Sequence, residues 1–341
     1  MENNIKPTEC RKCYDLESQG AISYRQEQNY VNQHREVKVG LKYLDVRFNN
    51  SCNLKCVMCN SSFSNQWVED ERKLINSKNE LIRKSIEPKI SFYNKNVFKW
   101  TNENDVLESI KQNTNTLDRI HFAGGEPLLS KQHYEILEYL IETGKNKELM
   151  ISYNTNICYI DSKIINLWNQ FKSVKVFLSM DGIGEVLEYV RYPIKFDDVT
   201  NVFDTIEKHS MPNIRYVIHY TLNALNTHSL PEFIEYKINL PYKSISPNEL
   251  FSIDCVNDPN YLAINVLPKK LFDSVIDKMK VLQNKYPSYS EQIEKIINRI
   301  KPSFLSPASA TLQDMFDYCK ELDKIRNTNS DNITDIIKTY L

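Results

Sequence analysis

The chain has 341 residues, of which 41% are hydrophobic and 26% are charged, and its formal net charge is −1. This composition is ordinary for a globular protein of one large or two modest domains. The near-neutral charge gives no bulk electrostatic argument for binding to nucleic acid or to a membrane surface, although it is compatible with a local basic groove.

Targeting signals are not apparent in the sequence. No apolar run approaches the roughly 20 residues that span a bilayer, and the polar N-terminus differs from a signal peptide. The sequence therefore predicts a cytoplasmic protein without a membrane partner. In that compartment the eight cysteines are expected to be metal ligands or free thiols rather than disulfides.

Residues 1–38 form a polar extension that contains Cys10 and Cys13. Two thiolates separated by two residues provide half of a metal site. The alternative interpretation is two reduced thiols on a surface helix. Either way, we expect this extension to precede the main domain.

From residue 41 onward, strand-like and helical patterns alternate. Strands are predicted at residues 41–48, 117–123, 148–153, 174–180 and 214–222. Helical patterns lie between and after them, at residues 64–86, 105–113, 131–143, 160–171, 197–209 and 230–237. This alternation predicts a mainly parallel sheet built from βαβ units, in which ligands bind at the carboxyl ends of the strands. We assign residues 39–240 to this core.

Residues 241–341 begin with an irregular, proline-punctuated segment. Amphipathic helices are predicted around residues 271–285 and 290–300, and a further helix at residues 308–326. We interpret this region as a smaller domain that covers the open side of the sheet.

Three cysteines with C-x3-C-x2-C spacing follow the first strand directly: Cys52, Cys56 and Cys59. Thiolates suit iron–sulfur clusters and zinc. A structural zinc ion or a cubane held entirely by protein needs four ligands. Three ligands leave one metal corner open, which favours chemistry over scaffolding. A zinc site that takes a remote fourth ligand is the alternative.

Polar residues and glycines follow the other strands. Gly124 and Gly125 allow the backbone to approach a ligand closely, and Glu126 comes next. Asn154 and Asn156 end the following strand, where they suit hydroxyl groups of a ligand or a turn.

The next two strands end in a similar way. Ser179 and Asp181 end one of them, and Asn223 closes the other. Arg191 lies between and suits a bidentate contact with a carboxylate, or an i,i+3 pair with Glu188.

The cysteine triplet, the Gly-Gly-Glu-Pro segment at 124–127 and the segments 179–182 and 188–192 resemble the radical S-adenosylmethionine (radical SAM) enzymes. Their combination is similar to the SPASM/twitch branch, and the resemblance covers about residues 40–225. It implies an α/β fold: a partial (β/α)6 TIM-like barrel of mainly parallel strands with a smaller C-terminal α+β cap.

The resemblance also implies cofactors and roles for these residues. The three cysteines would hold a [4Fe–4S] cluster whose fourth iron binds the amino and carboxylate groups of S-adenosylmethionine. The other cosubstrate contacts would involve the methionine amino group, its carboxylate, and the ribose or adenine, and would come from Gly124, Gly125, Glu126, Asn154, Asn156, Ser179, Asp181, Arg191 and Asn223.

Four further thiols, Cys10, Cys13, Cys255 and Cys319, would suffice for a second metal or iron–sulfur site. Twitch relatives carry one auxiliary cluster, but the C-terminal half here lacks their clustered cysteines, so both possibilities stay open. Cys158 is expected to be a small buried hydrophobic residue.

The expected reaction is reductive cleavage of S-adenosylmethionine to a 5′-deoxyadenosyl radical that abstracts a hydrogen atom from the substrate. A reduced flavodoxin or ferredoxin-type protein would donate the electron. The first hypothesis for the substrate is a ribosomal peptide, and the alternative is a nucleoside, a nucleic-acid base or a sugar. A non-catalytic iron–sulfur redox sensor is the hypothesis from another class. The sequence selects no catalytic residue and no reaction outcome.

Overall fold

The computed structural model describes residues 7–18, 23–33, 40–94 and 105–341. The chain divides into two compact units, residues 1–40 and 41–341. In the first unit, the 3-10 turn η1 (Thr8–Cys10) leads into helix α1 (Arg11–Ser18), and helix α2 (Tyr24–Asn32) follows. A capping box between Ser23 and Gln26 begins α2. The predicted pair Cys10 and Cys13 therefore lies on the last residue of η1 and the first turn of α1.

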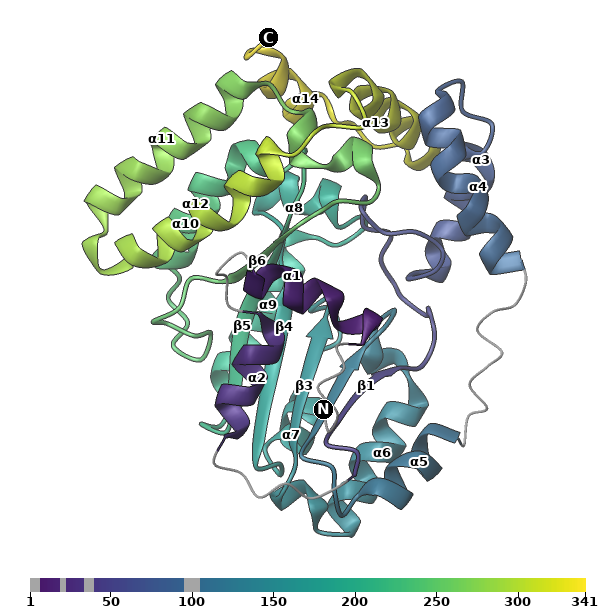
Figure 1. Ribbon diagram of the computed structural model, residues 1–341, viewed down its shortest axis with the longest axis vertical. Coiled ribbons are helices and arrows are strands. Elements are labelled where there is room, and N and C mark those ends of the chain that lie inside the picture. The colour runs from purple at the N-terminus through teal and green to yellow at the C-terminus, as the bar shows by residue number, and fades with distance from the viewer. Residues whose placement is uncertain (1–6, 19–22, 34–39, 95–104) are drawn as a thin grey trace. The chain divides into compact units, whose positions relative to one another are not determined.

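The second unit is built on a parallel sheet of six strands (Figure 1). Their spatial order is the order of the chain: β1 (Tyr43–Arg47), β2 (Arg119–Ala123), β3 (Met150–Thr155), β4 (Ser173–Ser179), β5 (Ile214–Leu222) and β6 (Ser252–Cys255). Every neighbouring pair is parallel. The sheet curls into a half-barrel surrounded by helices, which confirms the predicted partial TIM-like barrel.

Helices connect consecutive strands. Between β1 and β2 lie η2 (Asn65–Trp67), α3 (Val68–Leu74), α4 (Glu80–Asn94) and α5 (Asp105–Asn113). The later connections contain η4 (Pro127–Leu129), α6 (Lys131–Glu142), η5 (Lys145–Lys147), α7 (Ser162–Trp168), α8 (Gly184–Val190), α9 (Phe196–His209), η6 (Thr227–Ser229) and α10 (Leu230–Ile238). The five strands predicted from the sequence are all present. The four-residue strand β6 was missed, and it lies inside the segment assigned to the C-terminal region.

After β6 the described residues form helices and 3-10 turns: η7 (Asn260–Leu262), η8 (Ile264–Val266), α11 (Lys269–Lys285), η9 (Pro287–Tyr289), α12 (Ser290–Leu305), α13 (Leu312–Arg326) and α14 (Asp331–Lys338). Helices α11 and α12 pack together, and α13 packs against α3 and α4 (Figure 1). Among the described residues, no helix combines the length and the hydropathy needed to cross a bilayer.

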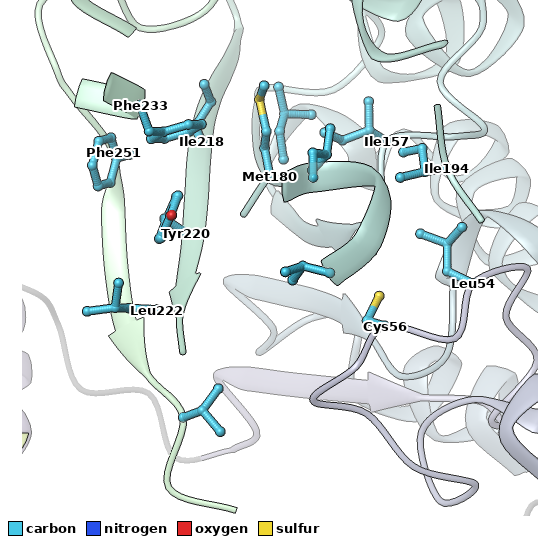
Figure 2. Packing of buried hydrophobic residues seen from close by; sticks show 14 of the residues in the cluster. Leu54, Cys56, Ile157, Met180, Ile194, Ile218, Tyr220, Leu222, Phe233 and Phe251 are labelled. Atoms are coloured by element: carbon cyan, nitrogen blue, oxygen red, sulfur yellow. The ribbon is translucent and has the colours of Figure 1, made fainter. Parts of the chain in front are cut away.

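Successive side chains of each strand point to opposite faces of the sheet, and one face is buried while the other is more accessible. In β4, Val174, Val176 and Leu178 are fully buried, whereas Lys175 and Phe177 on the other face are half-buried. Hydrophobic packing continues to the carboxyl ends of the strands. Figure 2 shows residues that share one hydrophobic core, and among them are Leu54 and Cys56 of the predicted metal loop. The core thus supports the place where the predicted site residues gather.

Candidate functional site

The cysteine loop follows β1 and is fixed by backbone hydrogen bonds to the last residue of α8 (Val190) and to Tyr192 just after it. The amide of Val57 donates to the carbonyl of Val190 at 2.8 Å, and the amide of Lys55 donates to that of Tyr192 at 2.8 Å. The Trp67 indole N–H donates to the carbonyl of Cys56 at 3.0 Å. A loop without regular structure is therefore held at several points, and its thiols have defined positions.

The three thiols share one environment. Cys56 is buried, and Cys52 and Cys59 are partly buried. A hydrogen bond between Cys56 and Cys59 lowers the pKa of Cys56 to about 7 and raises the pKa of Cys59. Burial raises the pKa of Cys52 to about 11. The structure thus brings the cysteine triplet of the sequence together.

Several N–H groups point at these sulfur atoms. The amide of Leu54 lies 3.4 Å from Cys52 Sγ, and Asn156 Nδ2 lies 3.6 Å from it. Arg191 Nη1 lies 3.7 Å from Cys56 Sγ. Contacts of this kind stabilise the negative charge of metal-bound thiolates and tune iron–sulfur clusters.

No three His, Cys, Asp or Glu side chains of the described residues surround a single point as one metal ion requires. In a cubane, each thiolate binds a different iron, so the three sulfur atoms need not converge on one point.

The glycine pair brings the β2 loop against the chain that precedes Cys52. Gly124 has φ +115°, a conformation that favours glycine. A Cβ atom on Gly125 would lie 2.2 Å from the carbonyl oxygen of Ser51. The amide of Glu126 donates to this same oxygen at 2.7 Å. Only a residue without a side chain permits this approach, so the backbone of the pair borders the cysteine loop.

Glu126 holds the β2 loop to the end of β3. One carboxylate oxygen accepts bonds from the Thr155 hydroxyl at 2.9 Å and the Leu128 amide at 3.2 Å, and the other accepts from the Asn156 amide at 2.7 Å. Burial raises the pKa of Glu126 to about 7. These bonds favour support of the loop over a direct ligand contact as the role of Glu126.

The two asparagines at the end of β3 differ, Asn154 lying in the strand and Asn156 just after it. Asn156 is buried, and its side chain donates to Asn53 Oδ1 at 2.7 Å as well as approaching Cys52. Asn154 is exposed on the strand. Asn156 therefore contacts the cysteine loop directly. No sequence motif marks Asn53, and it was not among the predicted site residues.

Asp181 and Arg191 form a buried ion pair at the end of β4. Arg191 Nε and Asp181 Oδ2 are 2.7 Å apart, but they lack hydrogen-bond geometry. Burial opposes the charge of Arg191, yet the Asp181 carboxylate outweighs it and raises the pKa of Arg191. The alternative pairing with Glu188 is not formed, since Glu188 bonds to Lys195 at 2.6 Å.

Two further predicted residues, Ser179 and Asn223, lie at the carboxyl ends of β4 and β5. Asn223 is buried in a turn, where its amide donates to Asn226 Oδ1 at 2.8 Å and its Oδ1 accepts from the Leu225 amide at 2.9 Å. Ser179 is half-buried at the end of β4 and pairs in register with His219. Asn226, which the sequence analysis missed, donates to the carbonyl of Asp181 at 3.0 Å.

A sequence model of the radical SAM superfamily matches residues 46–236, more than half of the chain. The chain belongs to the radical SAM superfamily. This confirms the resemblance drawn from the cysteine triplet and the Gly-Gly-Glu-Pro segment, and members of the superfamily are enzymes. Assignment to the twitch branch stays a prediction.

Relatives of this radical SAM chain include an uncharacterized protein of Methanocaldococcus jannaschii, 25% identical over 261 residues that cover 75% of this chain and 76% of the relative. Among solved structures, anSMEcpe with bound AdoMet and a peptide aligns with TM-score 0.44 and 17% identity, over 72% of this chain and 62% of that one. Streptococcus suis SuiB bound to precursor peptide SuiA aligns with TM-score 0.44 and 13% identity, over 81% and 58%. This chain therefore spans about three-fifths of the length of either structure.

The residues present fit the cofactors that the superfamily implies. Three thiols with N–H donors suit a cluster. A side chain on Gly125 would collide with the chain before Cys52 and would prevent the Gly125 backbone from approaching the cysteine loop. A buried guanidinium, Arg191, lies between Asp181 and the Cys56 sulfur.

A second metal site finds less support. Cys319 is buried in α13 beside Tyr189, and burial raises its pKa to about 12. Cys255 ends β6 near Ser303 and Arg299 of α12. These two thiols have separate surroundings, and a site that also includes Cys10 and Cys13 stays a prediction.

Proposed function

We propose that this chain reductively cleaves S-adenosylmethionine at a [4Fe–4S] cluster held by Cys52, Cys56 and Cys59. When bound, the reduced cluster and S-adenosylmethionine supply a 5′-deoxyadenosyl radical that abstracts a substrate hydrogen atom. The observation that supports this most is that the three thiols of the loop lie beside a glycine backbone at the carboxyl ends of parallel strands.

The chain's own residues would bind and orient the cosubstrate. The backbone of Gly124 and Gly125 would face the methionine amino group, and Glu126 would hold that loop in place. Arg191 would bind the methionine carboxylate while its pairing with Asp181 keeps the guanidinium aligned. Asn156 would orient Cys52 through its side-chain amide. Asn154, Ser179 and Asn223 stay candidates for ribose and adenine.

Anaerobic reconstitution with iron and sulfide tests the proposal. With dithionite and S-adenosylmethionine, we expect the wild type to release 5′-deoxyadenosine, measured by liquid chromatography. Cys56→Ala should lose the product, because the cluster loses one of its three ligands. Arg72→Gln, which changes an exposed side chain of α3, should keep it. A wild-type chain with a full cluster and no 5′-deoxyadenosine would favour the redox-sensor alternative.

The same preparations test the second cluster. If the wild type and a Cys10/Cys13 double substitution both bind about four irons per chain, a second cluster is excluded. If the wild type binds about eight irons and the double substitution about four, a second cluster is supported. Reduced flavodoxin or ferredoxin in place of dithionite tests the proposed electron donor.

For the substrate, we propose a ribosomally made peptide, and a nucleoside, base or sugar is the alternative. The accessible face of the sheet carries polar side chains such as Asp45, Arg47 and Lys175, which suit a polar substrate of either kind. Stimulation of 5′-deoxyadenosine release by a peptide encoded beside the gene, but not by nucleosides, would support the peptide. The reverse result would support the alternative.

A further inference from the structure

The C-terminal helix α13 reaches the cysteine loop from behind. The Tyr318 hydroxyl donates to the carbonyl of Val57 at 2.8 Å, and both groups are buried. Val57 is the residue after Cys56, so this bond fixes the loop between two of its thiols. Helix α13 also packs against α3 and α4, which follow the loop in the chain.

Arg326, the last residue of α13, enters a buried group of charges that we name the Asp70 triad: Lys55, Asp70 and Arg326. Arg326 Nε lies 2.7 Å from one oxygen of Asp70, and Lys55 Nζ lies 2.9 Å from the other. The side chains of Arg326 and Asp70 are only 2% and 3% exposed. Two cations therefore share one carboxylate, and the triad carries an excess positive charge.

The position of this charge relative to the thiols follows from two aromatic rings. The Arg326 guanidinium lies 4.5 Å from the centroid of the Trp67 ring, whose indole N–H bonds to the carbonyl of Cys56. It also lies 5.3 Å from the ring of Tyr192, which neighbours Arg191. One indole thus separates Arg326 from the backbone of a predicted ligand. Arg326 Nη2 is buried without a hydrogen-bond partner among the described residues.

We propose that Arg326 is part of the cluster site and that its buried positive charge raises the reduction potential of the cluster. Reduction adds one negative charge to the cluster. A nearby cation that solvent does not screen stabilises the reduced form, and local charge is one of the factors that set these potentials. Arg326 is then a positioning residue that acts through the field of the triad and through Trp67. This inference rests on the proposed function, because it requires the cluster.

Midpoint potentials test it. Each anaerobically reconstituted variant is titrated with dithionite while the reduced cluster is followed by electron paramagnetic resonance, and iron per chain is measured in parallel. Arg326→Gln and Lys55→Gln each remove a cation and should lower the midpoint, with the larger shift for the more buried Arg326. Asp70→Asn removes the anion and should raise it.

The matched control is Arg72→Gln. It removes the same charge from α3, but the Arg72 side chain is 57% exposed and its field is screened by solvent. Its midpoint should equal that of the wild type. If the substitutions acted only by loosening the cysteine loop, the midpoint potentials of all three triad variants would shift in the same direction. A lower midpoint in Arg326→Gln and Lys55→Gln together with a higher one in Asp70→Asn therefore indicates an electrostatic effect.

Unchanged midpoints, or shifts of one sign, in variants that keep their iron would overturn the inference. If Arg326→Gln fails to assemble a cluster, Lys55→Gln and Asp70→Asn decide the sign. A wild-type chain that takes up no cluster would instead overturn the proposed function.

Discussion

Two regions of the molecule bury titratable side chains, and they differ in the partners that they provide for a buried charge. At the carboxyl ends of the strands, Asp181 and Arg191 form an ion pair, and the Glu126 carboxylate accepts three hydrogen bonds. Behind the sheet, His133 of α6 is fully buried, with its Nε2 2.8 Å from the Tyr153 hydroxyl and its ring edge-on to Phe122. Burial lowers the pKa of His133 to about 3, so the ring is neutral.

The difference shows where the fold maintains buried charge. Burial alone drives a group to its neutral form, as it does for His133. Retaining an ion in the interior requires partners from several elements and gains little stability over apolar packing. Such a concentration beside three thiols supports the proposed ligand site.

The largest effect on stability is expected from Arg191→Met. It leaves Asp181 buried without its cation, which should lower the free energy of unfolding by about 3–5 kcal/mol. Adding Asp181→Asn should restore part of this loss. Arg215→Met is the control, because its pair with Glu249 is exposed and should contribute at most about 1 kcal/mol. Urea unfolding measures all four chains. If Arg191→Met and Arg215→Met lower the free energy of unfolding equally, the Asp181–Arg191 pair does not differ from an exposed pair, which contradicts the prediction.

A smaller effect is the pH dependence of stability. The folded-state pKa of His133 lies below its ordinary value, so acidification from pH 7 to 5 protonates the unfolded chain first and lowers stability by about 2 kcal/mol. The folded-state pKa of Glu126 lies above its ordinary value, so the same acidification protonates the folded chain first and raises stability by a similar amount.

Variants of the cluster-free chain should reveal how much each group contributes to the change of the unfolding free energy with pH. Partly buried His121, His219 and His228 also have lowered pKa values and contribute to every chain, so each variant is compared with the wild type. On acidification from pH 7 to 5, Glu126→Gln should lose more stability than the wild type, and His133→Gln should lose less. Urea unfolding at both pH values measures these differences, and differences of the same sign would contradict the assignment.

The smallest effects come from a matched pair of hydroxyls on β3. At pH 8, where Glu126 with its pKa of about 7 is mostly ionised, Thr155→Val removes a donor to its carboxylate and should cost about 2 kcal/mol, whereas Tyr153→Phe removes the partner of neutral His133 and should cost about 1 kcal/mol. Both substitutions preserve the shape of the side chain. Thermal or urea unfolding ranks them, and a larger loss for Tyr153→Phe would show that charge does not set the order.

Much of the fold could be predicted from the sequence, because five strands and their helices have distinct periodic patterns. Strand β6 was missed because it has only four residues and adjoins an irregular segment. The cysteine triplet and the glycine pair were found because chemistry fixes their local spacing. The partners of these residues were not found. Asp70 and Arg326 are separated by 256 residues, and no local pattern links them. The role of Glu126 as a support likewise depends on Thr155 and Asn156 of another strand.

The bond between Tyr318 and Val57 joins residues 261 positions apart. During synthesis the cysteine loop leaves the ribosome long before α13 exists. The loop consequently reaches its final backing only after almost all of the described chain has been made. We therefore expect the proposed cluster to assemble only after α13 has been made.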